Sequence, residues 1–204
     1  MTTSQAAPSA APQPVCHYRL TMPIVPDDKD WTWVLTEPCN DCGFVAAEVP
    51  FAEVSERVRE NAAAWPALLA RPDAALRPTG DQWSALEYAC HVRDVFRLYE
   101  HRLGLMLAED DPLFANWNQD DTAVAERYDL QDRSVVSAEL LAAGESIAAR
   151  FAEVTPDQLH RRGRRSDGAA FTIDTFARYF LHDPVHHLDD VRRGNVTLAN
   201  SQLD

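Results

Sequence analysis

The chain has 204 residues, enough for one well-buried domain and short for two. Its formal net charge of −13 excludes a protein that binds duplex nucleic acid through a basic footprint, so we expect no nucleic-acid partner. The sequence contains no uninterrupted apolar run long enough to span a bilayer, so we expect no membrane partner either.

The first fifty residues have no regular apolar pattern. Residues 1–14 are rich in Ala, Ser, Thr, Gln and Pro and lack the basic start and apolar core of a secretory signal, which predicts a disordered tail on a cytoplasmic protein. Residues 15–50 follow as an irregular N-terminal arm. Within it, the alternating run from Trp31 to Leu35 predicts a short strand or an extended segment over the core. The segment from Cys39 to Gly43 has the composition of a tight turn.

Residues 51–204 are predicted to form an all-α four-helix bundle, because apolar residues recur there at three- and four-residue steps. The four helical segments are residues 51–70, 84–108, 135–154 and 173–193, the last ended by Gly194. Residues 110–132 form one long crossover connection, long enough to return along a helix of about 36 Å and let the third helix run parallel to the second. We expect no sheet, and we interpret Arg161 to Arg165 as a solvated loop, with an anion-binding loop as the alternative.

The fourth helical segment carries His182 and His186. Residues four apart lie on one face of a helix, so these two imidazoles can share one cation. His91 lies in the middle of the second segment among apolar neighbours, where an imidazole without a partner is costly. We therefore predict one divalent metal between His91, His182 and His186. Three histidines leave at least one coordination position open, as catalytic sites require.

Carboxylates near these histidines are candidates for supporting them. Metal-bound histidines usually donate their second ring N–H to a carboxylate or a carbonyl. Glu87, Asp94 and Asp190 lie three or four residues from a predicted ligand, and each is either such a partner or an ordinary surface carboxylate. Pro184 either kinks the fourth helix or marks its start, and in the second case His182 leaves the shared face.

The cysteines raise a separate question. Cys39-x2-Cys42 can supply two ligands of a structural zinc, with Cys16 or His17 completing the set. We favour a reduced surface turn over this site, and a redox pair is disfavoured because no thioredoxin-like strand–helix unit flanks it. Cys90 lies within a helical pattern and is expected to be a small core residue.

Two motifs resemble those of the DinB-like, YfiT-like superfamily. They are Trp83-Ser-Ala-Leu-Glu-Tyr-Ala-Cys-His91-Val-Arg-Asp94 in the second segment and His182-x3-His186-His187 in the fourth. The resemblance extends over residues 51–193. It implies a four-helix bundle with a three-histidine site for zinc, or alternatively nickel. Carried onto this chain, the ligands are His91, His182 and His186, with His187 facing elsewhere.

The resemblance also implies an activity. Members of the superfamily include thiol-dependent S-transferases and the mycothiol-dependent maleylpyruvate isomerase. A cation stabilises thiolate, which is the nucleophilic form of a thiol. We therefore expect a metal-dependent S-transferase or isomerase that uses a low-molecular-weight thiol such as mycothiol on a small-molecule substrate. The alternatives are a thiol-free hydrolase, lyase or cyclase of a biosynthetic pathway, and a non-enzymatic small-molecule-binding stress protein. A homodimer is the base-rate expectation for the assembly.

Overall fold

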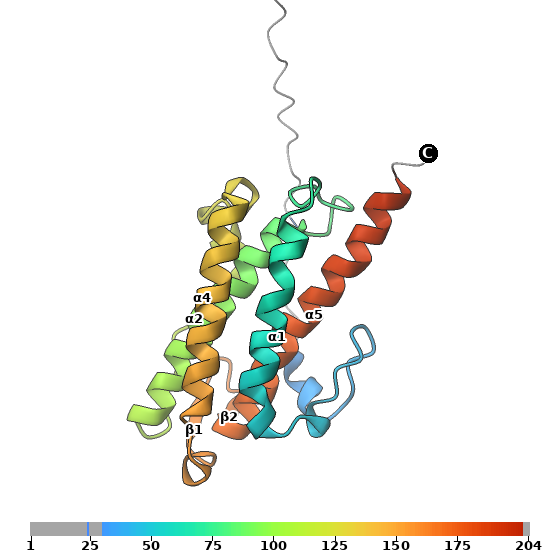
Figure 1. The fold of residues 1–204 in the computed structure, drawn as a ribbon. Coiled ribbons are helices and arrows are strands. Elements are labelled where there is room, and N and C mark those ends of the chain that lie inside the picture. Colours follow the sequence, from blue (N-terminus) through green and yellow to red (C-terminus); the bar gives the residue numbers. More distant parts are fainter. Residues whose placement is uncertain (1–23, 25–29, 202–204) are drawn as a thin grey trace, which may run out of the picture.

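The structure is a computed structural model that describes residue 24 and residues 30–201. The predicted tail, Cys16 and His17 lie outside these residues. Four long helices form the bundle (Figure 1), which confirms the predicted all-α class. They are α1 (Phe51–Leu69), α2 (Ala85–Ala108), α4 (Arg133–Ala152) and α5 (Ile173–Asn200). None of the described helices combines the length and the apolar character needed to cross a membrane.

The order of the helices around the bundle differs from their order in the chain. Both α4 and α5 pack against α1 and α2, so α1 and α2 lie diagonally opposite each other. Contacts between α2 and α4 advance in the same direction along both helices, since Arg93 pairs with Glu139 and Glu100 accepts a hydrogen bond from Ser146. The two helices are therefore parallel, as Figure 1 shows, and the predicted crossover connection is confirmed.

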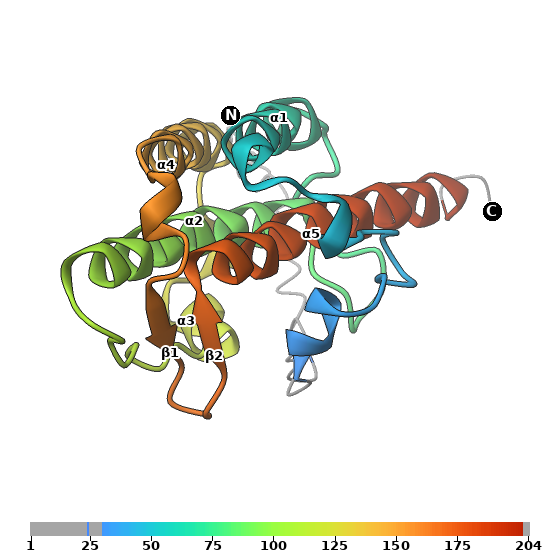
Figure 2. The ribbon, with the colours of Figure 1, turned by 90° about the horizontal axis from the view of Figure 1, so that it is seen from below.

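Shorter elements complete the fold. They are the 3-10 helices η1 (Trp31–Leu35), η2 (Ala46–Glu48), η3 (Tyr128–Leu130) and η4 (Pro156–Gln158), helix α3 (Gln119–Ala125), and strands β1 (Arg162–Arg164) and β2 (Ala170–Thr172). The arm, α3 and the two strands lie on the side of the α2–α5 layer that faces away from α1 and α4 (Figure 2). The crossover is therefore partly helical and forms part of a third layer.

Two local predictions were wrong. The run Trp31–Leu35 is a 3-10 helix and not a strand, because the Asp30 carboxylate accepts the N–H of Thr32 at 2.9 Å and caps a helical turn. The arginine-rich run is not a solvated loop but contributes β1, which pairs antiparallel with β2. Gly168, with φ of +97°, allows the turn between the two strands, and the buried Phe171 anchors the hairpin to the core.

Helix α5 is longer than predicted. It continues past Gly194, which is not its end but a point of close packing: a Cβ there would lie 2.6 Å from Cγ of Pro78. Pro184 lies inside the helix and does not begin it. Its carbonyl accepts a hydrogen bond of 2.8 Å from Nδ2 of Asn61, and Oδ1 of Asn61 accepts one of 3.1 Å from the indole of Trp65.

The start of α2 combines a capping box with a buried ion pair. Oγ of Ser84 accepts the N–H of Glu87, and the Glu87 carboxylate accepts the N–H of Ser84 at 2.9 Å. The same carboxylate accepts a hydrogen bond of 2.9 Å from Nε of Arg77. The side chains of Arg77 and Glu87 are only 15% and 5% exposed, so breaking this pair is costly because both charges are largely out of water.

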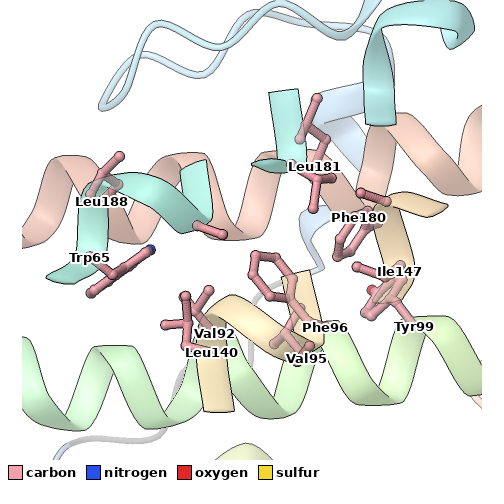
Figure 3. Packing of buried hydrophobic residues seen from close by; sticks show 14 of the residues in the cluster. Trp65, Val92, Val95, Phe96, Tyr99, Leu140, Ile147, Phe180, Leu181 and Leu188 are labelled. Atoms are coloured by element: carbon pink, nitrogen blue, oxygen red, sulfur yellow. The ribbon is translucent and has the colours of Figure 1, made fainter. Parts of the chain in front are cut away.

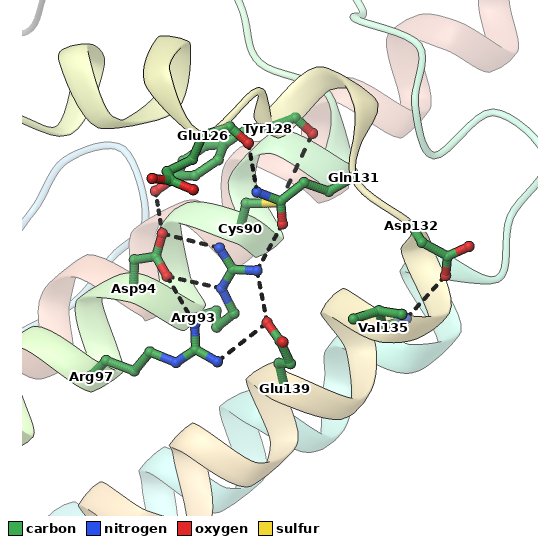
Figure 4. A network of polar contacts seen from close by, with 10 residues as sticks. All are labelled: Cys90, Arg93, Asp94, Arg97, Glu126, Tyr128, Gln131, Asp132, Val135 and Glu139. Carbon is green, nitrogen blue, oxygen red and sulfur yellow. Dashed lines mark hydrogen bonds and ion pairs between the residues drawn. The ribbon is translucent and has the colours of Figure 1, made fainter.

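A polar network fixes the crossover to the bundle (Figure 4). Arg93 is buried and donates to Oε1 of Gln131 at 2.8 Å and to Oε2 of Glu139 at 3.0 Å. It also pairs with Asp94, which accepts a hydrogen bond from the hydroxyl of Tyr128. The end of the crossover and α4 are thus both joined to one turn of α2.

The core between the four helices is apolar and closely packed (Figure 3). Each long helix contributes side chains with no exposed surface, among them Trp65, Phe96, Ile147 and Phe180. Burying one such side chain contributes about 1.5–3 kcal/mol. Cys90 is also fully buried, which confirms its predicted place in the core.

Replacing Gly144 by alanine should destabilise the protein. The new Cβ would lie 2.7 Å from Cβ of Ala62 and 3.2 Å from the ring of Phe96, and overpacking of this kind costs about 1–3 kcal/mol. In the control G104A the nearest atom is the end of Arg150 at 3.7 Å, so the higher helix propensity of alanine should stabilise by about 0.5–1 kcal/mol. Urea unfolding of both variants measures these opposite signs, and stabilisation by G144A would contradict the packing.

Replacing Glu87 by alanine should lower the free energy of unfolding by about 3–5 kcal/mol, because it breaks the buried ion pair with Arg77 and removes the carboxylate that accepts the N–H of Ser84. The control is E53A in the first turn of α1, where the exposed pair with Arg57 is expected to contribute no more than about 0.5 kcal/mol. Thermal unfolding compares the two variants. Equal losses would show that the Glu87 pair behaves as a surface pair.

Candidate functional site

A cavity of about 720 Å³ opens on the α2–α5 layer, on the side that carries the arm, α3 and the hairpin. This volume is typical of small-molecule sites. Each neighbouring segment contributes to its wall: Trp31 from the arm, Tyr88 from α2, Trp117 from the crossover, Arg165 from the hairpin and Tyr179 from α5.

Three donors meet beside this cavity, and we call them the cavity cluster: Asp183 and His187, which line the cavity, and His91, which is fully buried next to them. One ligand atom from each lies within 4.8 Å of the others. Oδ1 of Asp183 is 3.3 Å from Nε2 of His91 and 3.8 Å from Nε2 of His187. Helix α2 supplies the first residue, and one turn of α5 supplies the other two.

Neighbouring residues determine the burial of His91 and the charge of Asp183 in the cavity cluster. The ring of His91 is fully buried and packs against the rings of Trp83, 5.5 Å away, and Trp117, 5.6 Å away and nearly parallel. Desolvation favours the neutral form of Asp183, but the neighbouring imidazoles of His91 and His187 outweigh it and lower the pKa of this carboxyl to about 2. A charged carboxylate therefore faces both imidazoles.

The donor set fits a divalent cation. Oδ2 of Asp190 lies 3.0 Å from Nδ1 of His187, which places the ring proton there and leaves a lone pair on Nε2, toward Asp183. Two imidazoles and one carboxylate are the protein ligands of catalytic zinc sites and of iron(II) sites with open positions. The arrangement can thus bind a cation and still leave room for a substrate.

A second group of donors lies where the arm meets α5, and we call it the arm cluster: Cys39, Cys42, His182 and His186. One ligand atom from each lies within 4.8 Å of the others, and Sγ of Cys39 is 3.6 Å from Nδ1 of His186. Burial lowers the pKa of His182 to about 4, so this imidazole is neutral at pH 7. Burial raises the pKa of the Cys42 thiol to about 12.

The three histidines predicted to share one metal are divided between these clusters. His182 and His186 do lie together, with ring centroids 5.1 Å apart, but they face the two cysteines. The expectation that His187 faces elsewhere was wrong, because its ring lies 4.8 Å from that of His91. Asp183 and His187 have the same four-residue spacing as His182 and His186, so spacing could not decide which pair meets α2.

Of the carboxylates predicted to support the histidines, only Asp190 contacts one among the described residues. It bonds to His187, and Oδ2 also lies 3.7 Å from Nε2 of His186. Glu87 and Asp94 have other partners. The first caps α2 and pairs with Arg77, and the second belongs to the network that holds the crossover.

A buried arginine lines another part of the cavity. Arg102 is 7% exposed, donates to the carbonyl of Ala115 at 3.1 Å and lies over the rings of Tyr99 and Phe114. Burial lowers its pKa, and no carboxylate in residues 30–201 forms an ion pair with it. It follows His91 by eleven residues on α2, about 16 Å along the helix axis. The two regions of the wall therefore have different chemistry.

The fold matches a solved structure. That structure is YfiT from Bacillus subtilis, described as a probable metal-dependent hydrolase with an unusual four-helix bundle topology. The match has a TM-score of 0.64 and 16% sequence identity, and it covers 76% of this chain and 88% of that one. No family model and no curated protein sequence matches the chain. The protein is thus a four-helix bundle with the fold of YfiT.

Proposed function

We propose that the protein is a metal-dependent enzyme that acts on a small molecule in the cavity. The observation that carries this proposal is the position of the cavity cluster: Asp183 and His187 line a substrate-sized space, and the buried His91 meets them from α2. Three protein donors are the number that catalytic sites use when a further position must stay open. Zinc is the metal that we expect first, and nickel and iron(II) are the alternatives.

The residues around the cluster have separate roles in this proposal. A divalent cation bound there lowers the pKa of a thiol or of water and so supplies a nucleophile at neutral pH. Asp190 fixes the orientation and the tautomer of His187. Trp83 and Trp117 pack against the ring of His91, which is fully shielded from water.

Two reaction types follow from this chemistry. The two histidine motifs resemble a superfamily that includes thiol-dependent S-transferases, which supports transfer or isomerisation with a low-molecular-weight thiol such as mycothiol. Hydrolysis without a thiol is the second candidate, supported by the description of the matching Bacillus subtilis structure as a probable hydrolase. Both reactions use the same cation and differ in the nucleophile.

Metal content tests the ligand set. The variants D183A and H187A should each lose the cation of the cavity cluster and at least about 99% of any turnover, because removing a ligand or its support costs metal affinity severely. The matched controls D189A, on the same helix, and H101A, on α2, remove partly or fully exposed residues outside the cluster and should keep both. Elemental analysis of purified protein measures the metal. Unchanged metal and turnover in D183A and H187A would contradict the proposed ligands.

Assays with and without a thiol separate the two reactions. Turnover of an electrophile that requires mycothiol or a similar thiol supports transfer, whereas turnover of esters or amides with thiols excluded supports hydrolysis. Binding of a small molecule with no turnover under either condition would favour the non-enzymatic alternative.

Arg102 is proposed to bind an anionic group of the substrate, because it is a buried cation on the cavity wall. Hydrogen bonds to a charged group contribute about 1.5–3 kcal/mol, so R102M should raise KM for a carboxylate-bearing substrate about tenfold or more and leave metal content unchanged. The control R97M removes an exposed arginine of α2 that pairs with Glu139. Steady-state kinetics on both variants makes the comparison, and an unchanged KM in R102M would remove this role.

A further inference from the structure

We propose that the arm cluster is a second metal site, a tetrahedral Cys2His2 zinc site that joins the N-terminal arm to α5. Its ligands are Cys39, Cys42, His182 and His186. The proposal does not depend on the enzymatic function above, because its four donors are separate from those of the cavity cluster.

The spacing of the donors fits zinc. Tetrahedral bonds of about 2.0–2.3 Å place the ligand atoms about 3.3–3.8 Å from one another. Sγ of Cys39 and Nδ1 of His186 are 3.6 Å apart, and all four ligand atoms lie within 4.8 Å of one another. The site therefore needs only small side-chain shifts to close on a cation.

The local structure of the arm presents both cysteines together. The N–H of Gly43 donates to the carbonyl of Cys39 at 2.8 Å, and the N–H of Cys39 donates to the carbonyl of Phe44 at 2.8 Å. Gly43 has φ of +73°, which lets the chain reverse between these bonds.

The histidines provide an independent indication. Nε2 of His182 is buried and has no hydrogen-bond partner among the residues described, which is uncommon for a buried polar atom. Nδ1 of His186 lies 3.6 Å from Sγ of Cys39, and Nε2 of the same ring lies 3.7 Å from Oδ2 of Asp190. A bound cation would provide the missing partner of His182 and account for the position of His186 next to Cys39.

A Cys39–Cys42 disulfide is the competing chemistry. Both thiols are free in the structure, and a disulfide would leave the two imidazoles facing them without a role. Four neutral or ionisable donors of the two types that zinc prefers, brought together from two distant segments, favour a cation over an oxidised pair.

The site would position one wall of the cavity. Trp31 of the arm packs against the rings of His182 and His186, at 5.4 and 5.2 Å, and it lines the cavity together with Asp41. The carbonyl of Asp41 also accepts a hydrogen bond from Arg193 of α5 at 3.1 Å. Zinc bound by Cys39 and Cys42 would hold this part of the arm, and with it the cavity wall, against α5.

Cobalt substitution of the full chain under reducing conditions tests the site. Wild type loaded with Co²⁺ should show thiolate-to-cobalt charge-transfer absorption, and the double variant C39S/C42S should lack it. The double variant H91A/H187A, which removes only the cavity cluster, should keep it. C90A is the matched control, since it removes a buried thiol outside both clusters and should keep the absorption and the metal.

Zinc should also protect the arm. The rate of amide hydrogen exchange in residues 30–50 should rise at least about tenfold in C39S/C42S, or in wild type after chelation, because bound zinc suppresses local unfolding of the arm. Absence of thiolate-to-cobalt absorption in wild type, with Cys39 and Cys42 still reactive toward a thiol reagent in the presence of equimolar zinc, would overturn the proposal. So would an intact disulfide under the reducing conditions used. Wild type that shows the absorption but binds no cation at the cavity cluster would count against the proposed enzyme and leave this site standing.

Discussion

The angle of about 100° between successive residues of α5 governs the arrangement of both clusters. Because of this angle, His182 with His186 and Asp183 with His187 form two neighbouring stripes that cannot face the same neighbour. One stripe meets α2 and the other meets the arm. Asp190, one turn further along, lies close to a histidine of each stripe. Two groups of donors can thus lie side by side without competing for one centre.

The topology of the bundle brings the remaining parts to the same place. Since α2 and α4 are parallel, the chain must return along the outside of α2, and this return carries Trp117 onto the ring of His91. The Arg93 network then fixes the end of the crossover. A connection required by the helix order therefore also forms a wall of the cavity.

The sequence predicted the helices and the crossover well, because apolar periodicity reports directly which faces are buried. It also singled out His91, since an imidazole among apolar residues needs a partner. It could not assign the stripes of α5, because Asp183 and His187 have the same spacing as His182 and His186. Gly194 was read as a helix end because close approach of Pro78 is a tertiary contact, and the hairpin was missed because its pairing depends on Phe171 reaching the core.

The helix order has a consequence for folding speed. In an up-and-down bundle each helix meets its neighbour in the chain, and such local contacts make helical proteins fold fast. Here α1 packs mainly against α4, with α2 and the whole crossover between them in the chain. The chain between α1 and α4 must form a closed loop before most of the core can form. The entropy lost in closing this loop slows folding because the compensating contacts form only afterwards. This bundle should cross its folding barrier more slowly than an up-and-down bundle of equal length.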